Sequence, residues 1–374
     1  MPSRPLDRAA ESGFTLFMNF TLFGYSKSGK TTLFNLLTGA HEHTAGFDEG
    51  KREAHLRTVS FPDDRLARLA AVYPEKKAVS WSIDLLDLAG LSFGEVKNST
   101  LLSHLRKSDL LVHTVRGFTD PLIPHPKGRV SPREDILSME QELILADLVS
   151  VEARLEKLEL DLKKKKDPEA EKEREVLAAL RPALEEGKAV RETELGPAEE
   201  KAIRGFAFLS QKPLLHIVNL AESDTSSLEK PESLAPPARK GIAVLAFCGR
   251  IEGEISELSA EDKAAFIAEY GLKELTSPKF FRFARSLLDM ILFYTVGKDE
   301  VRAWTVKRGS HAQKAAGVIH TDMEKGFIRA EVVHLDDQLR LGSLQHAKEK
   351  GAIRLEGKDY PVLDGDVIYF RFTS

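Results

Sequence analysis

Apolar residues in the first part of the chain occur in short runs that alternate with helical patterns. Residues 14–23 are aromatic and β-favouring and lead into Gly24, which is typical of a buried strand that ends in a glycine turn. After Lys30 the apolar residues take helical spacing as far as Gly39, a residue type that commonly ends a helix. Further strands are predicted at 81–87, 110–115, 214–219 and 242–247. This alternation predicts an α/β domain with a mostly parallel sheet.

A helical segment interrupts the alternation. From about Ser138 to Val190 the chain is rich in Glu, Lys, Leu and Ala, with leucines at coiled-coil-like spacing on both sides of Lys163–Lys166, Asp167 and Pro168. The pattern predicts two antiparallel helices that are joined at this Lys-Asp-Pro tip and inserted into the α/β domain. The lysine run fits either a solvated turn or a tip that contacts RNA or a ribosome, and the sequence leaves both interpretations open.

The last part of the chain has a different pattern. A helical pattern at Phe280–Phe293 is followed from Thr295 onward by β-rich stretches that glycine turns separate, with one helical pattern near Ser343–Lys350. Strands are predicted at 301–306, 327–333 and 366–372. A small α+β domain is therefore expected at the C-terminal end.

The charge distribution sets the helical insertion apart from the rest. The chain has 374 residues and a formal net charge of −4, whereas residues 138–200 alone carry 11 Lys and Arg against 18 Asp and Glu, a net −7. Bulk charge therefore does not favour nucleic acid, and no DNA partner is expected. The absence of an apolar run approaching roughly 18 residues, the polar N-terminus and the single cysteine, Cys248, predict a cytoplasmic protein without a membrane partner. The oligomeric state stays open, with a monomer expected.

Residues Gly24–Thr31 read G-x-x-x-x-G-K-[ST], the motif of a phosphate loop. The glycines let the backbone approach a phosphate, and the backbone N–H groups and the positive end of the following helix would face the same anion. Lys30 is expected to contact the β- and γ-phosphates and the Thr31 hydroxyl to bind Mg²⁺. The predicted nucleotide-binding residues of this segment are Gly24, Tyr25, Ser26, Lys27, Ser28, Gly29, Lys30, Thr31 and Thr32.

Two further motifs follow predicted strands. Asp87-Leu-Ala-Gly90 looks like the D-x-x-G element of switch proteins, in which Asp87 would hold Mg²⁺ through water and the Gly90 N–H would contact the γ-phosphate. Asn219-Leu-Ala-Glu222 lies where a guanine-reading N-K-x-D would lie, but its carboxylate is on a longer side chain and no lysine is present to pack over the base. Guanine selectivity is therefore not expected. Cys248 lies at the position of a fifth nucleotide-binding element, where it would pack beside the base or simply fill a buried position.

These motifs resemble those of the YchF-type (Obg-like) ATPases of the Obg GTPase group. The most specific match is the stretch Ala315–Glu331, and the resemblance extends over about Met18 to Ser374. It implies a Ras-like P-loop G domain that is interrupted by a coiled-coil hairpin and followed by a TGS domain of β-grasp form. It further implies that the N-x-x-E variant accepts ATP in preference to GTP, and that His113 is the candidate catalytic residue, although a buried structural histidine would look the same. Other matching stretches are 62–66, 113–116, 146–148, 300–304, 356–360 and 364–367.

The resemblance and the residue patterns together predict five segments. They are an N-terminal extension at 1–17, a G domain in two parts at 18–137 and 201–293, a helical hairpin insertion at 138–200, and a TGS domain at 294–374. The acidic composition of the insertion and the β-rich pattern of the last segment are the sequence features that mark these boundaries.

The sequence departs from the family in both switch regions. The first switch, Gly46–Glu53, has no threonine at the Mg²⁺-sensing position, and the second, Ser92–Thr100, is shorter and poorer in glycine. Leu91 occupies the position of the water-positioning glutamine of Ras-like proteins, and Lys27-Ser28 replaces the usual Asn-Val.

The motifs and these departures together allow two functions. One is an Mg²⁺-dependent switch protein that hydrolyses ATP slowly and engages ribosomes, RNA or translation- and stress-related partners through its TGS domain and hairpin. The alternative is a nucleotide-binding adaptor with little or no hydrolysis.

Overall fold

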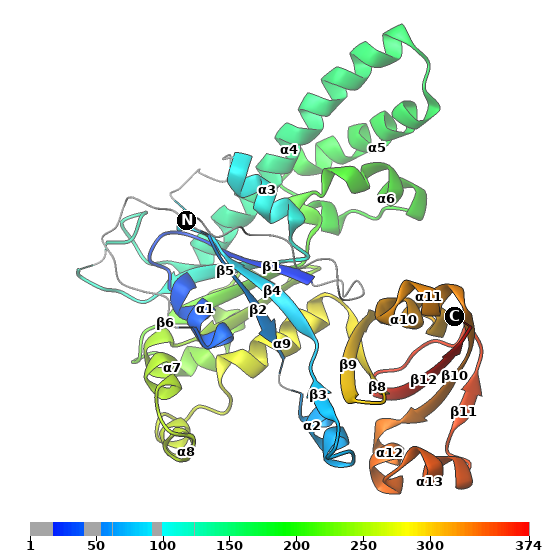
Figure 1. The fold of residues 1–374 in the computed structure, drawn as a ribbon. Coiled ribbons are helices and arrows are strands. Elements are labelled where there is room, and N and C mark those ends of the chain that lie inside the picture. Colours follow the sequence, from blue (N-terminus) through cyan, green and yellow to red (C-terminus); the bar gives the residue numbers. More distant parts are fainter. Residues whose placement is uncertain (1–17, 41–53, 62, 92–98, 123, 374) are drawn as a thin grey trace, which may run out of the picture. The chain divides into compact units, whose positions relative to one another are not determined.

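The computed structural model describes residues 18–40, 54–61, 63–91, 99–122 and 124–373 (Figure 1). They form two compact units, each with its own six-stranded sheet. The larger unit comprises Asn19–Val59 and Asp84–Leu287, and the C-terminal unit comprises Ser60–Ile83 and the chain from Leu288 onward. None of the helices formed by the described residues combines the length and hydrophobicity that crossing a bilayer requires.

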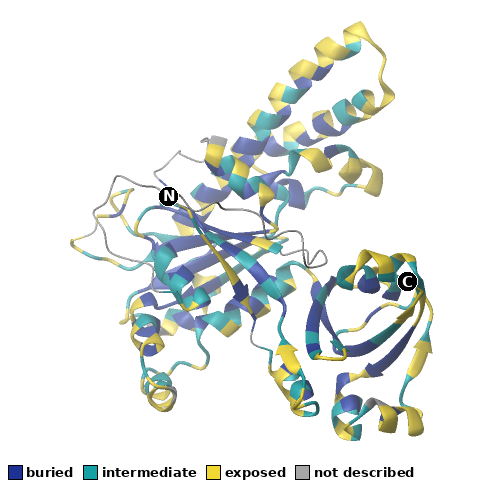
Figure 2. Ribbon diagram, viewed as in Figure 1, coloured by how far each residue is buried: buried dark blue, intermediate teal, exposed yellow. Residues whose placement is uncertain are grey.

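A mostly parallel sheet lies at the centre of the larger unit. Its strands are β1 (Met18–Phe23), β2 (His55–Ser60), β4 (Ser82–Asp87), β5 (Leu110–Gly117), β6 (Leu214–Leu220) and β7 (Ile242–Phe247). Their order is β2-β4-β1-β5-β6-β7, with parallel pairing from β1 through β7. β5 and β6 are buried along almost their entire length (Figure 2), as expected for parallel strands with both faces covered. The predicted α/β class is confirmed.

Helices cover the sheet of the larger unit. Apart from short turns, they are α1 (Lys30–Thr38), α3 (Ser99–Lys107), α4 (Pro132–Lys164), α5 (Pro168–Glu185), α6 (Pro197–Ile203), α7 (Gly249–Ser256), α8 (Ala260–Glu269) and α9 (Thr276–Leu287). Side chains along β1 point alternately to the two faces of the sheet, so neighbouring residues pack against different helices. Phe20 packs edge-to-face on Phe280 of α9, and Phe23 lies in a core cluster with Met139 of α4. The two faces of the sheet therefore have separate cores.

The two long helices of the insertion, α4 and α5, run side by side as the sequence predicts (Figure 1). Their shared core is aliphatic and includes Leu155, Leu158, Leu177 and Leu180. α4 begins at Pro132, earlier than the predicted Ser138, because proline fits the first helical position and the following apolar residues pack against the sheet. At the tip, the carboxylate of Asp167 accepts hydrogen bonds from the first N–H groups of α5 and so caps that helix. The lysines of the tip are exposed, which both interpretations allow.

The C-terminal unit contains a mixed sheet in the order β11-β10-β12-β8-β9-β3. Its strands are β3 (Lys77–Val79), β8 (Met290–Val296), β9 (Glu300–Lys307), β10 (Phe327–His334), β11 (Arg354–Glu356) and β12 (Asp366–Phe372). Its helices are α2 (Asp64–Ala71), α10 (Ala312–Ile319), α11 (Thr321–Lys325), α12 (Leu335–Leu341) and α13 (Leu344–Glu349). β12 pairs in parallel with β8 between antiparallel pairs, and residues of α10 lie in the core cluster of the sheet. This arrangement agrees with the expected β-grasp form.

One predicted element at the start of this unit is wrong. The helical pattern at Phe280–Phe293 forms a helix only as far as Leu287, and a strand begins at Met290. Asp289 takes a left-handed backbone conformation with φ 50°, which ends the helix, and the β-favouring residues after it then pair with β9. The two compact units accordingly divide after Leu287, before the predicted boundary at 293.

Residues Ser60–Ile83 belong to the C-terminal unit, although the sequence analysis assigned them to the first part of the G domain. Within this unit the Tyr294 hydroxyl donates to Asp63 Oδ2 at 2.6 Å, and Arg65 donates to Asp364 at 2.8 Å. β3 adds a parallel strand to the edge of β9. Because these partners lie more than two hundred positions away along the chain, no local pattern could have indicated the assignment.

Candidate functional site

The predicted phosphate loop connects β1 to α1, as the motif requires. Gly24 has φ 141°, and a Cβ there would come 2.4 Å from the backbone oxygen of Thr114. Gly29 has φ 96°, and a Cβ there would come 2.2 Å from Nδ2 of Asn219. Both positions therefore need glycine for conformation and for space. α1 begins at Lys30, so its first N–H groups directly follow the loop.

Lys30 is buried and lies inside the loop. Its Nζ donates to the backbone oxygens of Gly24 at 3.2 Å and Tyr25 at 2.9 Å. Burial lowers the pKa of Lys30 to about 8, and the charge of Asp87 opposes this shift only in part. An anionic ligand in the loop would favour the charged form of the lysine and would be bound more tightly by it.

Thr31 and Asp87, the predicted Mg²⁺ ligands, lie next to each other. Thr31 Oγ1 donates to Asp87 Oδ2 at 2.9 Å, and the carboxylate is buried at the end of β4. Ser28 Oγ in the loop is buried and has no hydrogen-bond partner among the described residues. Hydroxyl and carboxylate oxygens are the hard ligands that Mg²⁺ takes, so these residues fit that ion. No group of three or more His, Cys, Asp or Glu within the described ranges fits a metal site of another kind.

The D-x-x-G element packs directly on the phosphate loop. The N–H of Ser26 donates to the oxygen of Leu91, and the N–H of Leu91 donates to the oxygen of Gly24, both at 3.0 Å. A Cβ at Gly90 would come 2.5 Å from Ser26 Oγ, so the two segments are in close contact. The structure thus brings Gly90 next to the loop, as predicted, and places the apolar Leu91 in a buried cluster.

Lys27 adopts a left-handed backbone conformation with φ 62°. Asparagine, the usual residue of the resembled family, tolerates this region better than lysine does. We expect the Lys27→Gly variant to be more stable than the Lys27→Ala variant by about 1 kcal/mol, because alanine loses the same side chain but keeps the strained Cβ. Urea unfolding of the two variants measures the difference. Equal stabilities would contradict the assigned strain.

Asn219 connects two loops. Its Nδ2 donates to the backbone oxygen of Ser28 at 3.3 Å, and its Oδ1 accepts from the N–H of Gly249 at 2.9 Å. The side chain is buried and fixes the phosphate loop relative to the start of α7. Sequence reasoning assigned Asn219 to the base but did not predict this connection.

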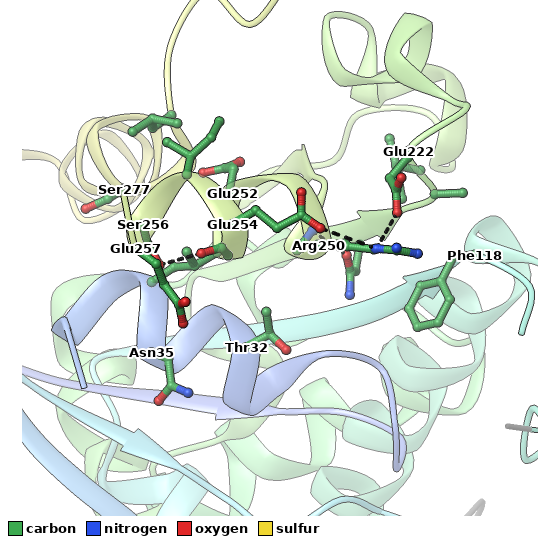
Figure 3. A pocket seen from close by; sticks show the side chains of 18 of the residues that line it. Thr32, Asn35, Phe118, Glu222, Arg250, Glu252, Glu254, Ser256, Glu257 and Ser277 are labelled. Atoms are coloured by element: carbon green, nitrogen blue, oxygen red, sulfur yellow. Dashed lines mark hydrogen bonds and ion pairs between the residues drawn. The ribbon is translucent and has the colours of Figure 1, made fainter. Parts of the chain in front are cut away.

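A cavity of about 1120 Å³ opens beside Asn219 (Figure 3). It is lined by Thr32, Asn35, Phe118, Asn219, Glu222 and Arg250, among others. The carboxylate of Glu222 lies 2.8 Å from Nε of Arg250, and both side chains are substantially exposed. Arg250 and Phe118 are not among the nucleotide-binding residues that the sequence predicts. Arg250 could have been found from the sequence, because it lies two residues after Cys248, at the position expected for the fifth nucleotide-binding element.

Cys248 is not among the described residues that line this cavity. It is 2% exposed and clusters with Ile251 and Ile255 of α7, and burial raises the pKa of its thiol. Of the two alternatives left by the sequence, this placement favours the buried packing position over contact with a base.

His113 lies on β5 beneath the phosphate loop and is fully buried. Its Nδ1 is 2.9 Å from Nδ1 of His216, its ring packs against Phe23, and its Cδ2 is 3.2 Å from where a Cβ of Gly24 would lie. Desolvation, together with the nearby positive charges, holds the pKa of His113 well below its usual value. The ring is therefore neutral. Its catalytic role stays a prediction.

The remaining predictions cannot be compared with the structure. The extension at 1–17, the first switch at Gly46–Glu53 and residues 92–98 of the second switch lie outside the described residues.

Comparison with known proteins decides the family. Residues 19–147 match a family described as "50S ribosome-binding GTPase", and residues 290–373 match the YchF-GTPase_C family, described as "Protein of unknown function (DUF933)". "Ribosome-binding ATPase YchF" of Bacillus subtilis (strain 168) is 39% identical over 360 residues, which cover 94% of this chain and 98% of the relative. The chain belongs to the YchF (Obg-like) ATPase family.

Other members of the YchF family agree over the whole chain. "Obg-like ATPase 1" of Oryza sativa subsp. japonica is 31% identical, with 99% of this chain and 95% of the relative covered. The solved structure of the Schizosaccharomyces pombe YchF GTPase has a TM-score of 0.78 at 25% identity and covers 95% of this chain and 97% of its own. The resemblance inferred from the motifs is confirmed. The P-loop fold with its helical insertion and C-terminal domain is that of the YchF family.

Proposed function

We propose that this chain is an Mg²⁺-dependent nucleotide-binding protein that hydrolyses ATP slowly, in preference to GTP, and acts with ribosomes or other translation- and stress-related partners. The observation that carries the proposal is the contact of Thr31 with Asp87 at 2.9 Å beside the buried Lys30. A helix N-terminus, a buried lysine and a hydroxyl–carboxylate pair are the groups that hold a nucleotide triphosphate together with its metal.

Each part of the phosphate site has a separate task. The loop N–H groups would bind the phosphate oxygens, Lys30 would neutralise the β- and γ-phosphates, and Thr31 and Asp87 would hold Mg²⁺, directly and through water. When bound, the ion would neutralise charge on the phosphates during transfer. Gly90 lies close enough to the loop for its N–H to respond to a γ-phosphate.

The preference for ATP is argued from the base cavity. A carboxylate selects guanine when it can accept from both the N1–H and the exocyclic amine of that base. Glu222 is one methylene longer than the aspartate of N-K-x-D, it already pairs with Arg250 at 2.8 Å, and no lysine is present to pack over the base, so guanine loses this advantage. Asn219 already uses both ends of its amide on protein groups, so it positions the cavity wall and has less to offer a base. Phe118 contributes an aromatic ring to the same cavity, which suits stacking with any purine. Cytoplasmic nucleotide pools would supply both ATP and GTP.

Slow hydrolysis is argued from Leu91. Its side chain is apolar and 6% exposed, so it cannot orient an attacking water as a glutamine does. The same observation supports the alternative, an adaptor that binds nucleotide and hydrolyses little or none. His113, whose Cδ2 lies 3.2 Å from where a Cβ of Gly24 would be, is the proposed source of residual catalysis.

The proposed partner comes from relatives. The B. subtilis relative and the Haemophilus ducreyi relative, 38% identical, are both named "Ribosome-binding ATPase YchF". In this chain, the exposed lysines of the hairpin tip and the C-terminal unit are the proposed contact regions, and the acidic hairpin argues against indiscriminate RNA binding. We expect a monomer in the cytoplasm.

Equilibrium binding of ATP and GTP with Mg²⁺, followed by turnover with and without ribosomes, tests the proposal. We expect micromolar binding that is tighter for ATP, lost on chelation of Mg²⁺, and slow turnover that ribosomes accelerate. Tighter binding of GTP would refute the reading of Glu222. If ATP and GTP bind but neither is hydrolysed under any condition, the alternative function, a nucleotide-binding adaptor without hydrolysis, would be the correct one.

A further inference from the structure

A buried chain of polar side chains connects the hairpin helix α4 to the phosphate loop. Glu140 of α4 is 3% exposed, and its Oε1 lies 3.4 Å from Nε2 of His216, which is fully buried on β6. Nδ1 of His216 lies 2.9 Å from Nδ1 of His113, on the neighbouring strand β5. The ring of His113 then abuts Gly24. Three side chains thus link a helix of the insertion to the loop.

The two oxygens of Glu140 face different groups. Oε2 accepts from Arg239 at 2.8 Å and from Arg191 at 3.3 Å, and these two charge-assisted hydrogen bonds fix the orientation of the side chain. Oε1 is left to face the imidazole of His216. At 3.4 Å this is an electrostatic contact, and Nε2 of His216 has no hydrogen-bond partner among the described residues. The negative carboxylate still favours the tautomer that turns an N–H, and not a lone pair, toward it.

The remaining protons follow from this first assignment. Burial lowers the pKa of both histidines, so each neutral ring carries one proton. If Nε2 of His216 is protonated, its Nδ1 is an acceptor, and the short contact then requires the proton of His113 to lie on Nδ1. Nε2 of His113 is consequently unprotonated. The opposite assignment would turn a lone pair of His216 toward the buried carboxylate.

We propose that Glu140 and His216 are positioning residues that fix the tautomer of His113, so that Nε2 of His113 is a proton acceptor at the phosphate loop. This nitrogen is buried without a hydrogen-bond partner among the described residues. The charged groups that act on it are Lys30 and Lys127 and, through His216, Glu140. An unprotonated ring nitrogen is what general-base chemistry on an attacking water requires. The inference rests on the proposed function for its consequence in turnover, but not for the tautomer itself.

The tautomers can be measured without any turnover. Long-range ¹H–¹⁵N correlation spectra of the full chain labelled with ¹⁵N-histidine distinguish a protonated from an unprotonated ring nitrogen. We expect Nδ1–H on His113 and Nε2–H on His216, with assignments from single His→Asn variants. A charged ring at neutral pH, or the proton of His113 on Nε2, would overturn the proposal whatever the protein hydrolyses.

The Glu140→Gln variant is expected to reverse both tautomers. Arg191 and Arg239 would hold the amide oxygen at the former Oε2 position, so the amide NH₂ would face His216 and donate to it. His216 would then carry its proton on Nδ1 and His113 on Nε2. ATP turnover should fall about 10-fold or more, with the dissociation constant for ATP changed less than about 2-fold.

The matched control is Glu152→Gln on the exposed side of the same helix, which should leave spectra and turnover unchanged. Reversed tautomers with unchanged turnover would show that His113 is not the base, and unreversed tautomers would show that Glu140 does not set them. Either of these two results contradicts the proposal. If the Glu140→Gln variant fails to fold, the tautomers seen in the wild-type spectrum still test the proposal. Absence of turnover in the wild-type protein would instead refute the proposed hydrolysis.

Discussion

Replacement of Lys30 by alanine is expected to weaken ATP binding by about 100-fold or more. The lysine is buried in the loop, and its Nζ has only two carbonyl oxygens as hydrogen-bond acceptors in the described structure. Loss of one partner of a buried charge pair costs about 2–5 kcal/mol, and each 1.4 kcal/mol changes an affinity tenfold. Isothermal titration of the variant and the wild type with Mg-ATP measures the change.

The fold of the Lys30→Ala variant has to be verified separately, because the oxygens of Gly24 and Tyr25 lose their donor. Circular dichroism and thermal unfolding serve this purpose. Lys201→Ala, at an exposed lysine of α6, is the control and should bind ATP as the wild type does. Unchanged affinity in a folded Lys30→Ala protein would remove the assignment of Gly24–Thr31 as a phosphate loop.

Replacement of Gly24 by alanine is expected to destabilise the protein by at least about 3 kcal/mol. The Cβ would meet the backbone oxygen of Thr114 at 2.4 Å, in the middle of the sheet, where the strand cannot move aside. The backbone angle of 141° adds conformational strain. Chemical denaturation gives the free energy of unfolding, provided that the transition is two-state.

Gly39→Ala is the matched control for Gly24→Ala. Gly39 also has a positive φ, 66°, but a Cβ there would meet nothing within 4 Å. The Gly39→Ala variant should therefore lose only the free energy that comes from backbone conformational strain, about 1 kcal/mol. If both variants lost the same stability, close packing of the loop on β5 would not be the cause.

The elements that the sequence predicted well have a local signal. The strands at 110–117 and 214–220 are continuous apolar runs because helices cover both faces of the sheet, and the phosphate loop has glycines where the backbone needs them. β2 was missed because only Val59 of its six residues is buried, which leaves no apolar pattern. The helix predicted over 280–293 includes the first residues of the strand at 290–296, because Asp289, which ends the helix in a left-handed conformation, is not the glycine that usually marks such an end.

The site was predictable only in part for a related reason. Lys30, Thr31 and Asp87 stand in motifs whose spacing reveals their roles, and the structure brings them together. Arg250 and the pair of Glu140 with His216 act through contacts between segments far apart along the chain. Such contacts depend on the tertiary fold, which a single sequence without aligned relatives does not encode in any local pattern.

The assignment of residues 60–83 has a consequence for how the protein can be divided. Because β3 and α2 are built into the C-terminal unit, the described chain enters that unit at Ser60, leaves it after Ile83 and enters it again at Leu288. A truncation after Leu287 would not excise a module: it would leave β3 without β9, and Tyr73 without Gln338 of α12. Residues 288–374 expressed alone would in turn expose the edge of β9 as an aggregation-prone strand. A heterologous swap of this part would therefore have to exchange both segments together.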